Sequence, residues 1–159
     1  MTSPTIEIAP VHKTLTVNAS QAHAFDVFVN GIDKWWPKSH NIGEGPVTKI
    51  VIEPRKGGRW FSHHENGSEA VNGHVLAWDP PGHLVLSWEI STQFKAAPGV
   101  KSEIELRFTA EGPKTTRVEL LHHKFETMGA EDGKLMRDTV DGPMGWSGLL
   151  EEFKKHAEG

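Results

Sequence analysis

The end of the chain, from Thr139 to Gly159, carries an apolar stripe beside a charged face. Apolar side chains recur there at the spacing of one helical face: Trp146, Leu149, Leu150, Phe153 and Ala157. This spacing predicts one long amphipathic helix that packs against other elements. Asp141 is placed to cap it, and Pro143 fits its first turn, where the missing N–H of proline does no harm. Because glycine weakens a helix, Gly145 and Gly148 predict that a neighbouring element packs very close at this point.

A shorter helical pattern lies near the start of the chain. A strand from Val11 to Val17 is predicted to precede it, and Ser20 is placed to cap the helix. Its core-facing stripe is expected to comprise Ala22, Phe25, Phe28, Val29 and Ile32. Gly31 and the run from Trp35 to Pro37 should end the helix.

Between these two helices, apolar and polar residues alternate in a way that is typical of strands. The alternation predicts about six antiparallel strands, which begin near Thr48 and continue in residues 60–64, 71–78, 84–90, 103–109 and 117–123. Turn signals such as Asn66-Gly67 separate them. Residues 134–140 are expected to add a helical turn. The order of strand, helix, strands and a final long helix predicts an α+β fold.

Composition narrows the classes of function. The chain has 159 residues, a net charge of −4 and no cysteine. We expect one domain over residues 1–159. An acidic balance without a basic cluster argues against nucleic acid as a partner. The absence of cysteine excludes disulfides and thiolate sites. The first residues have neither a basic start nor an apolar run, so we expect no signal peptide, no membrane insertion and a cytoplasmic location.

Several short motifs, in their order and spacing, resemble one protein family. They are Ala24-Phe25, Trp35-Trp36-Pro37, Gly57 to Phe61, Gly73 to Pro81, Leu84 to Trp88, Glu105 to Thr109, Thr116 to Leu120, and Gly145-Trp146 with Leu149-Leu150. Together they resemble the SRPBCC (START/Bet v 1-like) superfamily, and within it the branch named for the activator of Hsp90 ATPase. The resemblance extends from about Val11 to Phe153.

This resemblance implies a helix-grip fold, in which a curved antiparallel sheet wraps around a long C-terminal helix, often with an elongated cavity between them. The superfamily includes lipid and hormone binders, polyketide cyclases and dehydratases, and co-chaperone domains. It therefore implies a fold and a cavity, but not a reaction. The founding co-chaperones of the branch carry a separate N-terminal domain, for which 159 residues leave no room. We accordingly expect stimulation of Hsp90 to be the weakest of the candidate functions.

Ten histidines are unusual for this length. The pairs His63-His64 and His122-His123 suggest metal ligands. However, neighbours on a strand point to opposite faces, so each pair offers one imidazole to a common site, and we expect no metal and no cofactor. His64 and His122 continue the predicted inner faces of their strands. There, each either has a buried partner or meets a ligand, and each could act as an acid–base group near neutral pH.

Six tryptophans suggest an aromatic interior. Trp78 is equally compatible with an outward position and with packing under the turn that follows it. Four other tryptophans and two histidines share an expected inward position and form the candidate ligand-binding set: Trp36, Trp60, His64, Trp88, His122 and Trp146. We name no catalytic residue for a binding protein. If the chain is an enzyme, His64 and His122 are the candidates.

Two functions compete at this stage. The first is a module that binds a small apolar or amphipathic molecule in an internal cavity. The second is a cyclase-like or dehydratase-like enzyme that uses His64 or His122. The pattern offers no set of polar residues spaced for catalysis, which favours binding. The sequence identifies no ligand, and it leaves open whether the chain forms a homodimer.

Overall fold

A computed structural model describes residues 8–142 and 145–159. Its strands are β1 (Val11–Val17), β2 (Val47–Ile52), β3 (Arg59–His64), β4 (Glu69–Asp79), β5 (His83–Trp88), β6 (Ser102–Gly112) and β7 (Thr115–His123). Its helices are α1 (Gln21–Val29), α2 (Ile32–Trp35), the 3-10 helix η1 (Phe125–Met128), α3 (Ala130–Asp141) and α4 (Trp146–Glu158).

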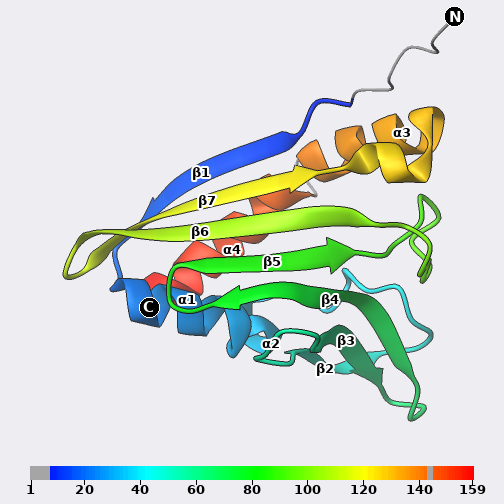
Figure 1. Ribbon diagram of the computed structural model, residues 1–159. Helices are drawn as coiled ribbons and strands as arrows, with labels where there is room; N and C mark the ends of the chain where they lie inside the picture. The colour runs from blue at the N-terminus through cyan, green and yellow to red at the C-terminus, as the bar shows by residue number, and fades with distance from the viewer. Residues whose placement is uncertain (1–7, 143–144) are drawn as a thin grey trace, which may run out of the picture.

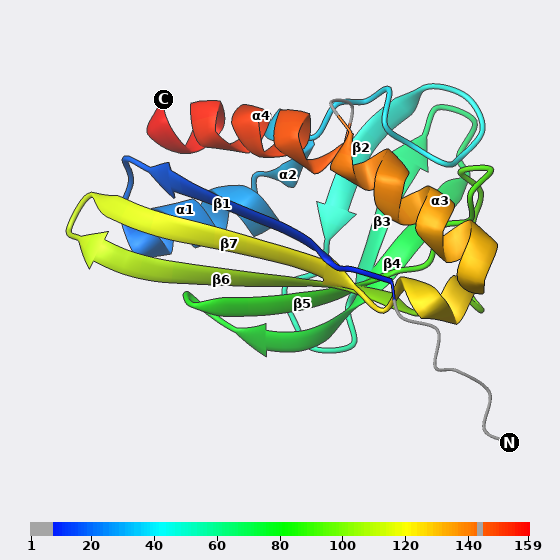
Figure 2. The same cartoon turned by 90° about the horizontal axis from the view of Figure 1, so that it is seen from above.

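The strands form one antiparallel sheet in the order β1-β7-β6-β5-β4-β3-β2. The sheet is curled, and the helices cover one of its faces (Figure 1). Seen from above, α3 and α4 follow one another along that face (Figure 2). Helix α4 contacts α1, α2, α3 and β1. The predicted α+β helix-grip fold, with a curved sheet around a C-terminal helix, is therefore confirmed.

Strands β6 and β7 show how the alternating pattern positions the core. Their pairing aligns Ile104 with His122 and Phe108 with Val118. Residues on the inner face of this pair are almost fully buried: Ile104, Leu106, Phe108, Val118, Leu120 and His122. On the outer face, Arg107 Nε lies 3.0 Å from a carboxylate oxygen of Glu105. One face of the sheet thus supplies the apolar wall on which the helices pack.

The start of α1 follows the prediction closely. Ser20 Oγ accepts a hydrogen bond from the His23 N–H over 3.2 Å, so the predicted cap is confirmed. Phe25, Phe28 and Val29 of the predicted stripe are buried on α1, whereas Ile32 is buried but belongs to the separate helix α2. Ala22 is exposed, and Ala24 is buried in its place.

The terminal helix begins later than predicted, because α4 starts at Trp146 and not near Asp141. The helical turn expected at residues 134–140 is part of the longer helix α3. Asp141 is the last residue of α3 and does not cap α4, while Pro143 lies outside the described residues. The predicted apolar stripe, Trp146 to Ala157, is buried as expected. A Cβ on Gly145 would lie 2.0 Å from the carbonyl oxygen of Val140, which confirms close packing there. Gly148 is exposed, and close packing at this glycine stays a prediction.

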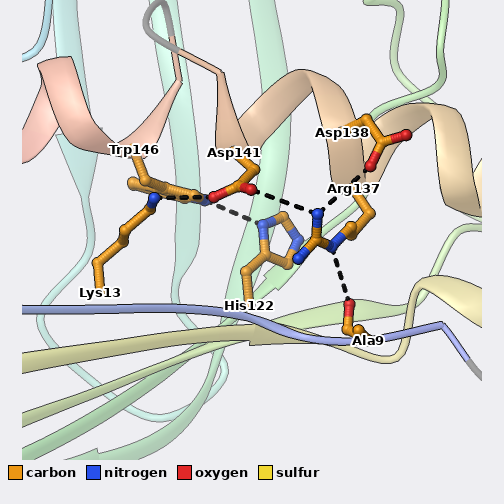
Figure 3. Close-up of polar contacts among 7 residues, drawn as sticks. All are labelled: Ala9, Lys13, His122, Arg137, Asp138, Asp141 and Trp146. Atoms are coloured by element: carbon orange, nitrogen blue, oxygen red, sulfur yellow. Dashed lines mark hydrogen bonds and ion pairs between the residues drawn. The ribbon is translucent and has the colours of Figure 1, made fainter.

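Two contacts attach the end of α3 to the edge of the sheet (Figure 3). Lys13 Nζ on β1 lies 2.8 Å from the Asp141 carboxylate, and Arg137 Nε donates to the Ala9 carbonyl over 3.2 Å. The hydrogen bond from Lys13 lowers the pKa of Asp141 below its ordinary value. These contacts hold the end of α3 against the N-terminal part of the chain.

Aromatic rings fill the space between α4 and the sheet in two connected clusters. In one, Phe153 lies 5.3 Å from Phe28 and 5.6 Å from Trp35, measured between ring centroids. In the other, Trp146 lies 6.0 Å from both Trp36 and Trp88. The first cluster closes one end of the interior. The second borders the cavity described next.

Candidate functional site

A cavity of about 440 Å³ lies beside the tryptophan cluster. The segment between α2 and β2, strands β4 and β5, the loop after β5 and the junction of α3 with α4 all contribute to its wall. Its lining is mostly apolar: Trp36, Ile42, Trp88, Ile90, Phe94, Val140, Gly145, Trp146 and Leu149. Phe94 is 45% exposed and marks the mouth of the cavity. The volume lies within the range of about 300–1,000 Å³ that is usual for small-molecule sites.

Most polar side chains of the lining lie at the rim and are hydrogen-bonded. Ser39 Oγ lies 3.3 Å from His40 Nδ1, and Asn41 Nδ2 donates to the Lys38 carbonyl over 2.9 Å. Thr139 Oγ1 donates to the Leu135 carbonyl over 2.8 Å. All of these cavity-lining residues are exposed or half-buried. The rim is therefore polar and exposed to solvent, whereas the interior of the cavity is apolar.

Asn72, on β4, differs from these rim residues. It is only 6% exposed, and it belongs to the cavity wall. Its backbone carbonyl accepts from the Glu89 N–H over 2.8 Å, which places Asn72 beside Trp88 across the two strands. Within residues 8–142 and 145–159, its side-chain amide has no hydrogen-bond partner.

His122 lies behind the cavity wall, in contact with two of its tryptophans. The Trp146 indole N–H donates to His122 Nδ1 over 3.0 Å (Figure 3). An indole N–H can only donate, so Nδ1 carries no proton and Nε2 must carry it. Nε2 then donates to Ser102 Oγ over 3.2 Å, and this hydroxyl donates to the Trp88 carbonyl over 3.2 Å. Burial lowers the pKa of His122 to about 3, so its imidazole is neutral.

His64 has a separate and equally complete set of partners. His64 Nδ1 lies 2.9 Å from the Gly45 carbonyl, which can only accept, so Nδ1 carries the proton. Nε2 therefore accepts from Ser62 Oγ, at 2.8 Å. The loop packs so closely over this ring that a Cβ on Gly43 would lie 2.2 Å from His64 Nε2. Its neighbour His63 points the other way and pairs with Glu69 at 3.2 Å.

The structure therefore divides the six candidate residues into two layers. Trp36, Trp88 and Trp146 line the cavity directly. Trp60, His64 and His122 are buried behind it, with Trp60 5.5 Å from Trp36 and His122 5.1 Å from Trp88 between ring centroids. Trp78 is half-buried and packs against Phe25 at 5.4 Å.

Sequence reasoning overlooked several lining residues. Leu149 and Ile90 were assigned to inner faces without being linked to a cavity. Asn72 was overlooked altogether, although it follows buried Ala70 on the same face of β4. A polar residue on an inward position was the signal that could have identified it.

Neither a metal site nor a membrane span is evident in the part of the chain that the structure describes. No three His, Asp or Glu side chains come together there in a way that could hold a metal ion. Of the helices in residues 8–142 and 145–159, none has the length and apolar character needed to cross a bilayer.

The solved structures to which this chain is similar include two that are more than 30% identical to it. The anthrahydroquino-γ-pyrone synthase Txn09 is 35% identical, with 96% of this chain and 99% of that chain covered and a TM-score of 0.65. The self-sacrificing resistance protein CalC from Micromonospora echinospora is 31% identical, with 93% of each chain covered and a TM-score of 0.70. No curated protein is similar enough to match.

A more distant neighbour shares the fold alone. The Aha1 dimer from Colwellia psychrerythraea is 14% identical, with 95% of this chain and 97% of that chain covered and a TM-score of 0.58. The family model described as "Activator of Hsp90 ATPase homolog 1-like protein" matches residues 18–158, which is nearly the whole chain. The protein thus belongs to the family of Activator of Hsp90 ATPase homolog 1-like proteins.

Proposed function

We propose that this protein binds a small, flat aromatic molecule in the cavity beside α4. The observation that carries this proposal is a cavity of about 440 Å³ whose wall includes Trp36, Trp88 and Trp146. Indole rings offer large apolar surfaces and favour stacked or edge-on contact with other rings. Micromolar affinity corresponds to about 8 kcal/mol. Burial of about 330 Å² of apolar surface would supply this before the costs of association.

The name of one relative above 30% identity supports this class of ligand. Txn09 is named as a synthase of an anthrahydroquino-γ-pyrone, a compound built from fused aromatic rings. CalC is named as a resistance protein, and its name states no ligand. One relative is thus an enzyme by name and the other a protective protein, so their names do not indicate a single reaction.

The surroundings of the two candidate histidines, His64 and His122, favour ligand binding over acid–base catalysis. Both ring nitrogens of His122 and of His64 already have partners within the protein. Neither ring belongs to the cavity lining. A general acid or base must come within hydrogen-bond distance of the reacting group. Catalysis is therefore the second candidate, supported by the 35% identity to a named synthase. Stimulation of Hsp90 is third, because it rests on the family name alone.

Titration with xanthone, a neutral tricyclic γ-pyrone, tests the proposal. We expect saturable quenching of tryptophan fluorescence at about one equivalent per chain, with micromolar affinity. Trp88→Ala should weaken binding at least tenfold, because it removes a ring from the wall. Trp78→Ala is the matched control and should change affinity little, because Trp78 packs on Phe25 outside the lining. Each variant is used only after its circular dichroism shows that it is folded.

Two results would contradict the binding proposal. If xanthone and related tricycles do not bind the wild-type protein, the cavity does not serve this class of ligand. If a bound compound is chemically converted, and His122→Ala abolishes conversion while leaving affinity intact, the enzyme hypothesis replaces the binding hypothesis.

A further inference from the structure

Asn72 stands apart from the other buried polar residues of the protein. The described residues include eight buried polar or charged side chains: Ser62, His64, Asn72, Ser87, Glu89, Ser102, Thr116 and His122. Seven of these make side-chain hydrogen bonds. Asn72 is the exception among residues 8–142 and 145–159. It is also the buried polar residue of the cavity wall.

Folding alone gives no reason for an asparagine at this position. The Asn72 amide has no partner in the described part of the protein, yet it is not among the fully buried side-chain atoms, so it faces the open space of the cavity, where a leucine of similar size would pack at least as well. The rim residues Asn41 and Thr139 show that polar side chains nearby do find protein partners. The free amide of Asn72 is therefore explained by a partner that enters the cavity.

The rest of the wall restricts what that partner can be. The described lining residues include no Asp, Glu, Lys or Arg, and His40 at the rim is their one titratable side chain. A carboxylate or ammonium group in the interior would thus be buried without an opposite charge, which is costly. The indole N–H of Trp88 is fully buried, so it does not reach the open space of the cavity. The side-chain amide of Asn72 is therefore the polar group that this part of the wall offers, and its NH₂ can donate to an acceptor on a ligand.

We propose that Asn72 is the specificity-determining residue of the cavity, and that its amide donates to a carbonyl oxygen of an uncharged, planar aromatic ligand. This inference rests on the proposed binding function, and it narrows the ligand to aromatic ketones, pyrones and quinones. Tryptophan rings hold the ring system, while Asn72 selects compounds that carry an acceptor at the matching edge.

A pair of compounds with matched shapes tests this inference. Xanthone and xanthene are tricycles of similar shape that differ in one carbonyl oxygen. The wild-type protein should bind xanthone about three- to tenfold more tightly than xanthene, the factor expected of one net hydrogen bond. Asn72→Leu should bring this ratio close to one by weakening xanthone binding, and it should leave xanthene binding unchanged or tighter. Its unfolding midpoint should not fall, because no protein hydrogen bond is lost.

Thr127→Val is the matched control, since it removes a hydroxyl outside the cavity lining that already has a partner. It should keep the preference for xanthone. Xanthene-9-carboxylate should bind at least tenfold more weakly than xanthone, because its charge would be unpaired. If wild-type protein and Asn72→Leu show the same ratio of affinities, the role of Asn72 is overturned while the binding function stands. If neither tricycle binds the wild-type protein, the proposed function fails, and this inference fails with it.

Discussion

The indole N–H of Trp146 donates to Nδ1 of His122 over 3.0 Å, and this bond joins the first turn of α4 to the end of β7 (Figure 3). This bond fixes the tautomer of the imidazole. The other ring nitrogen donates to the Ser102 hydroxyl, which in turn donates to the backbone carbonyl of Trp88. Two tryptophans of the cavity wall are thus linked through one neutral histidine. A proton on Nδ1 of His122 would break the bond from Trp146, because both nitrogens would then be donors.

The first prediction concerns pH. Burial depresses the pKa of His122 from 6.5 to about 3. Between these values, the unfolded chain takes up a proton that the folded protein does not. The free energy of unfolding should therefore fall as pH decreases below about 6.5, with a slope of up to about 1.4 kcal/mol per pH unit from this group. Above pH 6.5 or so, His122 should contribute no slope. Urea unfolding at a series of pH values measures this.

His122→Gln is the comparison for this prediction, because a glutamine oxygen can still accept from the Trp146 indole. Its stability should depend less on pH than that of the wild type between about pH 6 and pH 4.5. The difference between the two proteins isolates His122 from other groups that titrate in the same range. Equal slopes would mean that His122 becomes charged in the folded protein.

The second prediction uses two glycines, three residues apart, that differ in their surroundings. A Cβ at Gly145 would lie 2.0 Å from the Val140 carbonyl oxygen and 2.5 Å from its carbon, and backbone atoms cannot move aside easily. Gly145→Ala should therefore destabilise the protein by about 1–3 kcal/mol. Gly148 is exposed within α4, so Gly148→Ala should stabilise by about 0.5–1 kcal/mol. Thermal unfolding compares them, and shifts of the same sign would count against the close packing.

The third prediction tests which face of α4 is buried. Leu150 is 4% exposed, whereas Glu151 is exposed. Leu150→Asp would place an unpaired carboxylate against the sheet and should cost several kcal/mol, on the order of 3–5. Glu151→Asp should change the unfolding free energy by less than about 0.5 kcal/mol. If the two variants melt within about a degree of one another, the burial of this face is contradicted.

The sequence predicted most reliably what depends on regular periodicity. The alternation in β6 and β7 and the stripe from Trp146 to Ala157 each have one apolar face, and burial of that face needs no knowledge of distant residues. The same periodicity placed His64 and His122 inward, and both are buried. Their bonding partners, Gly45 and Trp146, come from segments far away in the chain, so no local pattern could identify them.

The start of α4 was misplaced for a related reason. Asp141, with Pro143 two residues later, has the local pattern of a helix start. In the fold, Lys13 and Arg137 hold the Asp141 carboxylate, so this residue ends a helix that packs on β1. Asn72 was missed because a single asparagine in a strand does not by itself indicate a ligand-binding position. Its significance appears only when the cavity and the absence of a partner among the described residues are considered together.

The last prediction concerns the mouth of the cavity, where Phe94 combines two features that are unfavourable for stability. Its ring is 45% exposed, and its backbone φ of 57° lies in the left-handed region. This backbone conformation costs a bulky residue more free energy than it costs asparagine. Phe94→Asn should therefore leave the unfolding free energy unchanged or raise it by up to about 1 kcal/mol. Because Phe94 lines the cavity, the same change should weaken xanthone binding about five- to thirtyfold by removing apolar contact.

Phe94→Leu separates these two effects. It keeps an apolar side chain at the mouth and keeps the backbone strain, so its affinity for xanthone should lie between those of the wild type and Phe94→Asn. Its stability should not exceed that of the wild type. Fluorescence titration and urea unfolding of the three proteins give both quantities. If Phe94→Asn binds xanthone as tightly as the wild type, Phe94 does not cover the bound ligand, and the ligand lies deeper, between Trp88 and Trp146.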